Sequence, residues 1–278
     1  MPELPEVETI VRDIGPYLTG RTLRNPQLHK TDVLRGISRR RLISSLDGQR
    51  VEHVSRRAKH AVLLLRNGLR LIIQPRMTGT LIVYDRTLRA AEQRYAVLEM
   101  KVGRRETFVY RDVRRLGTIH LLQEKAWLSY TARIGPEPLD DTFDFANFVA
   151  RLHGTRQAIK KTLMDQARIA GIGNIYANEA LFRAALDPSR RTDRIDRHSL
   201  ERLYRELRAV LGEAIAAQGT TFRDYRTGTG QRGSFQDSLL VYGRAGQPCT
   251  QCGTHLATTH AIDGRATYFC WRCQGTPS

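Results

Sequence analysis

Four cysteines near the end of this 278-residue sequence restrict its possible folds more than any other feature. They form two Cys-x-x-Cys pairs, Cys249–Cys252 and Cys270–Cys273, which are separated by residues 253–269. Two such pairs can close a tetrahedral Zn²⁺ site with four thiolates from the two turns of a hairpin. Four cysteines leave no open coordination position, so we expect one structural zinc ion. Disulfide bonds are the alternative, and the start of the sequence, which lacks the pattern of a secretory signal, argues against them.

The charge balance indicates a polyanionic partner. Lys and Arg number 45 against 28 Asp and Glu, a formal net charge of +17 at pH 7. Phosphate neutralisation by such cations supplies most non-specific nucleic-acid affinity. Ribosomal and membrane-surface proteins share the bias, so charge alone does not define a chemistry. No apolar run approaches the roughly 20 residues of a membrane helix, and we expect a cytoplasmic protein.

The first half of the sequence predicts one helix followed by strands. Apolar residues recur with helical period at Val7, Ile10, Val11 and Ile14, behind Pro5, which suits a helix start. Residues 60–65 and 69–74 flank Asn67-Gly68, a dipeptide favoured in type I′ hairpin turns. Further strand-like runs are 81–84, 95–102, 107–110 and 118–122. Short strands joined by tight turns predict a sandwich or a barrel-like domain.

The second half reads as helical. Two prolines and several turn-forming residues make 134–142 the best linker candidate. The clearest helix covers 199–218, with Ser199 as its expected N-cap, and another should begin near Asn174 after a glycine-containing turn. Residues 223–238 are rich in Gly, Thr, Arg and Gln and are expected to form a mobile loop. The expected domains are 1–133, 143–237 and the cysteine-containing 238–278.

Several short motifs occur in an order found in one known family. They are Met1–Glu8, Arg56–Lys59, Asp112–Gly117, Gly135–Pro138, Gly171–Glu179, Val241–Arg244 and the four-cysteine tail. In these motifs the chain resembles bacterial formamidopyrimidine-DNA glycosylases over essentially its whole length. The resemblance implies an α+β multidomain fold. Its parts would be an N-terminal β-sandwich with a leading helix, a helical domain with a helix–two-turn–helix motif, and a zinc-finger hairpin.

The resemblance also implies a bifunctional DNA glycosylase and abasic-site lyase. Such an enzyme would excise oxidised purines, 8-oxoguanine and formamidopyrimidines, from duplex DNA and cut the strand by β,δ-elimination. The implied nucleophile is the secondary amine of Pro2, exposed by removal of Met1. An α-amino group titrates near pH 7.7–8.0, and a helix N-terminus with nearby cations would increase its free-base fraction. Its attack on C1′ gives an iminium that acidifies C2′ and leads to elimination.

Three further residues belong to the implied catalytic set. Glu3 would act as general acid and base, because both base loss and elimination move protons. Glu6 would orient the site, and Lys59 would lie near the lesion phosphate.

Extruding a base from a duplex leaves a hole that protein side chains must fill. Met77 and Arg114 match the family's wedge residues, whereas Leu116 replaces the usual phenylalanine. Gln74-Pro-Arg76 stands where the family has His-Leu-Gly, and Val113 where proline is usual. Gln74 can still hydrogen-bond a phosphate. Because of these departures, the sequence does not define which base the protein prefers opposite the lesion, nor which lesions it accepts.

For the DNA backbone, the resemblance implies phosphate contacts from Asn174 and Arg265 and a cation near the lesion at Lys160. Loop 223–238 would close over the extruded base. The expected partner is double-stranded DNA with oxidised bases or abasic sites, bound by a monomer in the nucleoid of the bacterial cytoplasm.

Two alternatives remain. A sibling enzyme that prefers oxidised pyrimidines, similar to endonuclease VIII, is favoured slightly by Leu116 and disfavoured by Leu4-Pro5. A non-catalytic DNA-damage-binding protein would have the charge and the fold without the chemistry. Intact Pro2-Glu3 together with Lys59 argues against it.

Overall fold

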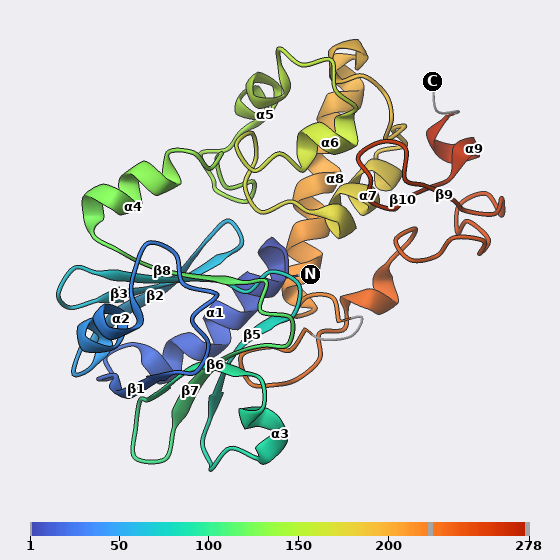
Figure 1. Ribbon diagram of the computed structural model, residues 1–278. Coiled ribbons are helices and arrows are strands. Elements are labelled where there is room, and N and C mark those ends of the chain that lie inside the picture. Colours follow the sequence, from blue (N-terminus) through green and yellow to red (C-terminus); the bar gives the residue numbers. More distant parts are fainter. Residues whose placement is uncertain (1, 222–224, 276–278) are drawn as a thin grey trace. The chain divides into compact units, whose positions relative to one another are not determined.

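The computed structural model describes residues 2–221 and 225–275 (Figure 1). The chain divides into two compact units. The first comprises Met1–Arg133 with Ala217–Gln236, and the second comprises Ile134–Ala216 with Asp237–Ser278.

Two four-stranded antiparallel sheets form the body of the first unit. One has the order β1-β6-β7-β5, with strands Arg24–Leu28, Ala96–Lys101, Thr107–Asp112 and Gly79–Tyr84. The other has the order β2-β3-β4-β8, with strands Val51–Arg57, His60–Leu65, Arg70–Gln74 and Thr118–Leu122. Apolar side chains of both sheets share one core, which confirms the predicted β-sandwich.

The leading helix, α1 (Leu4–Leu18), packs against strands of both sheets. Val7, Ile10, Val11 and Ile14 are buried in the shared core, as their spacing predicted. Pro5 lies in the first turn, where its missing N–H costs no helical hydrogen bond. The packing of α1 therefore fixes the position of its N-terminal end. Three shorter helices, α2 (Arg39–Leu46), α3 (Ala90–Gln93) and α4 (Glu124–Thr131), complete this part of the unit.

The β3–β4 hairpin forms where expected, but its turn differs from the predicted type I′. A type I′ turn needs positive φ at both central residues, and of the pair only Gly68 has it, at +78°. The Gly68 amide donates to the Leu65 carbonyl, and the Leu65 amide donates to the Leu69 carbonyl. The Asn67 side chain accepts from the Leu69 amide instead of adopting the left-handed conformation. The loop thus has three residues, with glycine in the left-handed position.

Helices α5 (Phe145–Leu152), α6 (Ile159–Leu163), α7 (Asn174–Arg183) and α8 (Arg197–Ala216) form most of the second unit. Helix α7 begins at the predicted residue. The predicted N-cap of α8 is wrong by three residues: Asp196 accepts hydrogen bonds from the amide and hydroxyl of Ser199, which lies inside the helix. The remaining elements are η1 (Thr192–Arg194), η2 (Phe235–Ser238), β9 (Ala257–Thr259), β10 (Thr267–Phe269) and α9 (Trp271–Gln274).

Residues 217–236 group with the sandwich, whereas the sequence-based boundaries placed them with the helical domain. In the described part, the Tyr225 hydroxyl donates to the carbonyls of Glu6 and Gln218, and the Val83 amide donates to the Gly228 carbonyl. A Cβ on Gly228 would lie 2.6 Å from the Asp13 Cβ, so this segment touches α1 closely. In the loop expected at 223–238, Phe235–Ser238 form the short helix η2 and several residues are buried; Arg223 and Asp224 lie outside the described residues. Within the described chain, no helix is long and apolar enough to cross a membrane.

Candidate active site and nucleic-acid interface

Pro2 and Glu3 are buried at the start of α1. Glu3 is the N-cap residue, and its amide donates to Glu6 Oε2 at 2.7 Å. The two glutamates complete a reciprocal capping box, which fixes the backbone next to Pro2. The sandwich core therefore holds the candidate nucleophile and the candidate acid on a rigid element.

Glu6 also binds the segment at 217–236. Its Oε1 accepts from the Thr220 amide at 2.8 Å, so one buried carboxylate joins two pieces of chain 214 residues apart. Gly219 has φ +81°, and a Cβ there would lie 3.0 Å from Glu6 Cγ. Burial and the Glu6 charge raise the pKa of the neighbouring Tyr225. Glu6 therefore fixes the backbone at Glu3 and at Thr220 together.

Lys59 lies with Ala58 in the two-residue turn between β2 and β3. Ala58 has φ +52°, and its carbonyl accepts from Arg56 at 3.0 Å. The same guanidinium donates to Glu8 Oε2 at 2.8 Å, which links the lysine turn to helix α1. Lys59 is therefore held in a defined place, with 9% of its surface exposed.

Glu8 is more than the helix-dipole acid that its position suggested. Burial alone would raise its pKa, but the hydrogen bonds and charges of Arg56 and Arg12 outweigh burial and lower that pKa. Glu8 therefore stays ionised and anchors Arg56.

His60, the residue after the Ala58-Lys59 turn, is held by hydrogen bonds at both ring nitrogens. The Arg57 carbonyl accepts from His60 Nδ1 at 3.0 Å, which leaves Nε2 to accept from the Tyr130 hydroxyl at 2.9 Å. Burial raises the pKa of Tyr130, so this hydroxyl keeps the proton that it donates. Sequence reasoning missed both residues, because their partners become evident only once α4 is placed on the sandwich.

The candidate wedge residues are exposed at loops of the sandwich. Met77 is 41% exposed, Leu116 is 42% exposed, and Arg114 is also exposed. Arg76 is exposed as well and has φ +48°, a conformation that favours the glycine usual at this place. Gln74 is half-buried at the end of β4, paired with Thr118.

In the second unit, Asn174 opens α7 and donates through its side chain to the Ala266 carbonyl at 2.9 Å. Ala266 follows Arg265, whose side chain is 59% exposed in the turn between β9 and β10. Asn178, one helical turn after Asn174, accepts from the Tyr268 amide at 2.7 Å. Both asparagines therefore hold the hairpin that carries Arg265.

Lys160, expected as a cation near the lesion, is buried in the second unit. Its side chain is 0% exposed, and Nζ donates to Asp263 at 3.2 Å and to Thr267 at 2.8 Å. Asp263 also accepts from the Arg265 amide. Lys160 thus supports the hairpin turn from inside, because a buried ammonium requires such partners. It offers no exposed cation to DNA.

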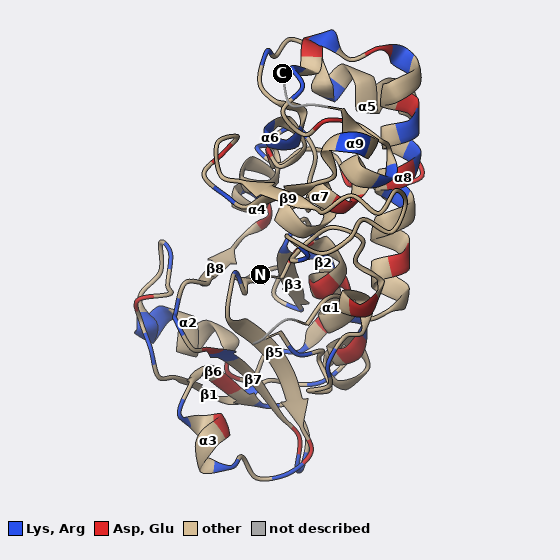
Figure 2. Ribbon diagram, turned by 90° about the vertical axis from the view of Figure 1, so that its right-hand side faces the viewer, with Lys and Arg blue, Asp and Glu red and all other residues tan. Residues whose placement is uncertain are grey.

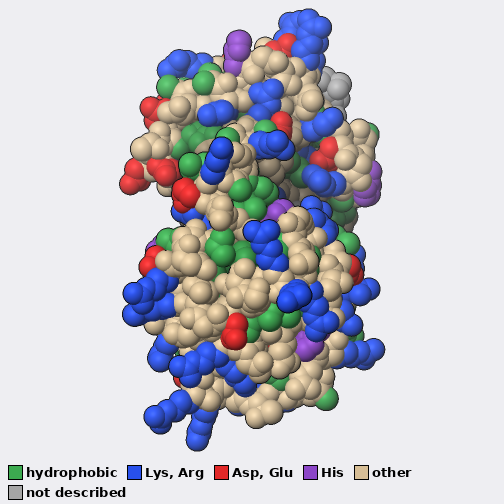
Figure 3. Space-filling view, turned by 60° about the vertical axis from the view of Figure 1, so that its left-hand side comes forward, with side chains coloured by type: hydrophobic (Ala, Val, Ile, Leu, Met, Phe, Trp, Pro, Cys, Tyr) green, Lys and Arg blue, Asp and Glu red, His purple; other side chains and the backbone are tan. Residues whose placement is uncertain are grey.

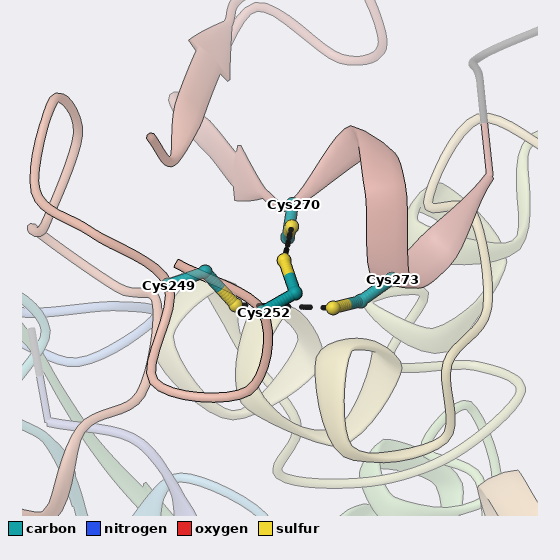
Figure 4. Close-up of side chains that lie close together, drawn as sticks. All are labelled: Cys249, Cys252, Cys270 and Cys273. Carbon is teal, nitrogen blue, oxygen red and sulfur yellow. Dashed lines mark hydrogen bonds between the residues drawn. The ribbon is translucent and has the colours of Figure 1, made fainter. Parts of the chain in front are cut away.

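The four cysteines lie together (Figure 4). All four sulfur atoms lie within 4.8 Å of one another; Cys249 and Cys273 are 3.8 Å apart, and Cys252 and Cys270 are 3.5 Å apart. Disulfide sulfurs would be about 2.05 Å apart. Four ligands at about 2.3 Å from a tetrahedral zinc would be about 3.8 Å apart. The donor set and its spacing therefore fit Zn²⁺.

Glu179 is a structural residue to which sequence reasoning gave no role. It is 0% exposed, and its carboxylate accepts from the amides of Leu240, Val241 and Tyr242 at 2.8–3.0 Å. Val241 and Tyr242 begin the Val241–Arg244 motif, and Glu179 ends the Gly171–Glu179 motif. Glu179 thus connects these two motifs. The only sequence signal for this contact was that both motifs belong to the set shared with the resembled family.

Charge is spread unevenly over the surface. Acidic and basic residues alternate along α8 (Figure 2). On the face drawn in Figure 3, Lys and Arg side chains are widespread and acidic ones are few. Such a surface suits a polyanionic partner.

Comparison with known proteins shows the family to which this chain belongs. The model of the formamidopyrimidine-DNA glycosylase N-terminal domain matches residues 1–119, and that of the H2TH domain of the same glycosylases matches residues 134–226. The chain belongs to the formamidopyrimidine-DNA glycosylase family. This confirms the resemblance seen in the motifs, and with it the enzyme class, a DNA-repair glycosylase.

Individual relatives cover the whole chain. The formamidopyrimidine-DNA glycosylase of Thermomicrobium roseum is 43% identical, with 99% of each chain covered. The crystal structure of the MutM (Fpg) protein of Thermus thermophilus matches with a TM-score of 0.86 and 35% identity, with 99% of each chain covered. The Lactococcus lactis Fpg in complex with abasic-site DNA matches with a TM-score of 0.90 and 31% identity over 99% of this chain and all of that chain.

Proposed function

We propose that this protein excises oxidised purines from double-stranded DNA and then cleaves the strand at the abasic site. One observation carries the proposal: Pro2 and Glu3 lie at the buried, doubly anchored start of α1. The substrate is supported by the relatives, which are named formamidopyrimidine-DNA glycosylases, and by Lactococcus lactis complexes with DNA that contains Fapy-dG or an abasic site.

The chemistry begins at the amine of Pro2, once Met1 has been removed. The nitrogen lone pair forms a bond to C1′, the bond from C1′ to the base breaks with its electron pair on the base, and the proton that the amine then loses neutralises the departing base. The remaining lone pair then forms the C=N bond as the C1′–O4′ bond opens, and Glu3 supplies a proton to O4′. Loss of a C2′ proton expels the 3′-phosphate, and a second elimination expels the 5′-phosphate.

Neighbouring residues position these groups. Glu6 fixes the backbone of Glu3 and that of Thr220 at the same time. Lys59, held in its turn by Arg56, supplies positive charge for a phosphate near the lesion. Met77, Arg114 and Leu116 fill the space left by the extruded base, and Gln74 remains a candidate hydrogen-bond donor to phosphate.

The second unit supplies phosphate contacts through Asn174 and through Arg265 on the hairpin. One Zn²⁺ held by Cys249, Cys252, Cys270 and Cys273 would stabilise this hairpin and take no part in catalysis, because four thiolates fill its coordination sphere. Lys160 acts here as a support of the hairpin turn.

Borohydride trapping tests the mechanism directly. With a duplex that contains 8-oxoguanine or an abasic site, we expect a covalent protein–DNA adduct that is lost in protein that retains Met1 and reduced in Pro2→Gly, which replaces the secondary amine by a primary one. Pro5→Gly, which alters a proline without an amine terminus, serves as the matched control and should still be trapped. An undiminished adduct in Pro2→Gly would refute the proline mechanism, and no adduct in the native protein would favour a non-catalytic binding protein.

Leu116 gives some support to a second substrate class, oxidised pyrimidines. It is 42% exposed and aliphatic, so it stacks less on the unpaired base than an aromatic ring would. Excision rates on duplexes with 8-oxoguanine and with a pyrimidine glycol separate the two. We expect the purine lesion to be removed faster.

A further inference from the structure

Two loops of the sandwich carry exposed aliphatic side chains. The first, residues 75–78, connects β4 with β5, and the second, residues 113–117, connects β7 with β8. We call them the wedge loops. Met77 on the first is 41% exposed; Val113 and Leu116 on the second are 47% and 42% exposed. The side chains that would enter the duplex therefore come from two separate pieces of chain.

A buried polar cluster joins the two loops below these side chains. Thr78 and Asp112 are 4% and 1% exposed, and the Thr78 hydroxyl donates to Asp112 Oδ1 at 2.5 Å. The same hydroxyl accepts from the Arg114 amide at 3.0 Å. Asp112 Oδ2 accepts from the Gly117 amide at 2.8 Å and from the Tyr110 hydroxyl at 3.1 Å. The Asp112 carboxylate thus holds the end of each loop, and the Thr78 hydroxyl holds the start of the second.

The backbone around this cluster leaves no space for a looser arrangement. A Cβ on Gly117 would lie 2.0 Å from the Tyr110 hydroxyl oxygen and 2.6 Å from the Gln74 carbonyl oxygen. Arg76 and Arg115 adopt positive φ values of +48° and +54°, which non-glycine residues keep only where their surroundings enforce them. A buried carboxylate with this many donors is a defined anchor, because an unpaired one would be strongly destabilising.

We propose that Asp112 and Thr78 are positioning residues that fix the spacing between Met77 and Leu116, so that both side chains enter the DNA as one preformed wedge. The inference rests on the proposed function. Two loops that moved independently would each lose conformational freedom on entering the duplex, and joining them in advance removes most of that cost. We call the pair of Asp112 and Thr78 the clamp; neither residue touches a reacting atom.

The test replaces the hydroxyl of Thr78. Thr78→Val has nearly the same shape without the hydroxyl, and Thr78→Ser keeps the hydroxyl. Thr80→Val changes a buried threonine in the adjoining strand β5, opposite Arg111. The probe is a duplex with a tetrahydrofuran abasic analogue opposite 2-aminopurine, whose fluorescence rises when a wedge unstacks it. For Thr78→Val we expect about half the rise or less and about tenfold weaker binding, the factor typical of a lost hydrogen bond to a charged group. Thr78→Ser and Thr80→Val should resemble the native protein.

An unchanged fluorescence rise in Thr78→Val would overturn the clamp. Should that variant fail to fold, hydrogen exchange of the native protein decides: the Arg114 and Gly117 amides should be protected although their neighbours are exposed, and exchange at the rate of an unstructured peptide would refute the proposal. Asp112→Asn gives a further measure, since it keeps an acceptor for Thr78 but places an NH₂ group where donors now bind.

Trapping on an abasic duplex separates the two proposals. If the native protein forms no adduct, the proposed function fails whatever the fluorescence shows. If native protein and Thr78→Val are trapped equally at saturating DNA and their fluorescence rises are also equal, only the clamp fails.

Discussion

The sandwich and the cysteine hairpin hold functional residues by different means. Under the start of α1 lies a continuous apolar core built from both sheets. The hairpin that carries Arg265 rests on a small cluster of five buried side chains, two of which, Cys249 and Cys270, are themselves candidate metal ligands. The start of α1 thus rests on a large apolar core in addition to the hydrogen bonds of Glu6, whereas the hairpin depends mainly on polar anchors and on four cysteines that fit a metal ion. The two regions should therefore respond to different perturbations.

The largest expected effect comes from the metal site. Cys249→Ser should lose the zinc, whose binding contributes on the order of 10 kcal/mol in small zinc domains, and should bind DNA at least about tenfold more weakly because Arg265 loses its support. Metal content and fluorescence anisotropy with duplex DNA measure both losses. Amide exchange in β3 should stay unchanged. Native protein that contains no stoichiometric metal would contradict the prediction, and loss of β3 protection would break the distinction between the regions.

The converse experiment destabilises the sandwich. Phe108 is 0% exposed in its core, and Phe108→Ala should lower the free energy of unfolding by about 3–5 kcal/mol, because the cavity cannot fully collapse. Urea unfolding followed by tryptophan fluorescence measures the change. Zinc content should remain one per chain, and a parallel loss of zinc would mean that the two regions unfold as one.

The smallest expected effect is electrostatic and depends on pH. Arg56 and Arg12 lower the pKa of Glu8, so the folded state favours its ionised form. This contribution is fully present above the ordinary carboxyl pKa and is lost as the pH falls through the lowered value. Glu8→Gln should therefore cost about 1 kcal/mol at pH 7, and the difference from the native protein should shrink in acid. Thermal unfolding at pH 7 and pH 3 measures this, and a cost that is the same at both would contradict it.

Local patterns predicted much of this molecule. The spacing of four cysteines predicted a cluster that the structure brings together, and apolar periodicity predicted α1 and most strands. The wrong predictions, the N-cap of α8 and the turn type at Asn67-Gly68, arose where neighbouring groups compete for the same hydrogen bond or conformation. Asp196 caps α8 in place of Ser199, and the Asn67 side chain binds the Leu69 amide in place of a type I′ conformation.

Partners distant in sequence could not be predicted. Lys160 was expected as a cation near the lesion, and its partners Asp263 and Thr267 follow 103 and 107 residues later in the sequence. Thr78 received no role from the sequence and Asp112 only a place in a motif, because strand pairing alone reveals that they share a buried site. Residues 217–236 contain no pattern that assigns them to the sandwich rather than to the helix that precedes them.

The hydrogen bond from Thr220 to Glu6 has a consequence for biosynthesis. A ribosome makes the proline end first, but the carboxylate beside it meets its second partner only after 214 further residues have been added. During translation the strands of the sandwich can pair, yet the candidate catalytic end of α1 lacks this contact until residue 220 has emerged. The order of synthesis thus delays assembly of the complete candidate site until helices α5 to α8 of the second unit, which precede Thr220 in the sequence, have been made.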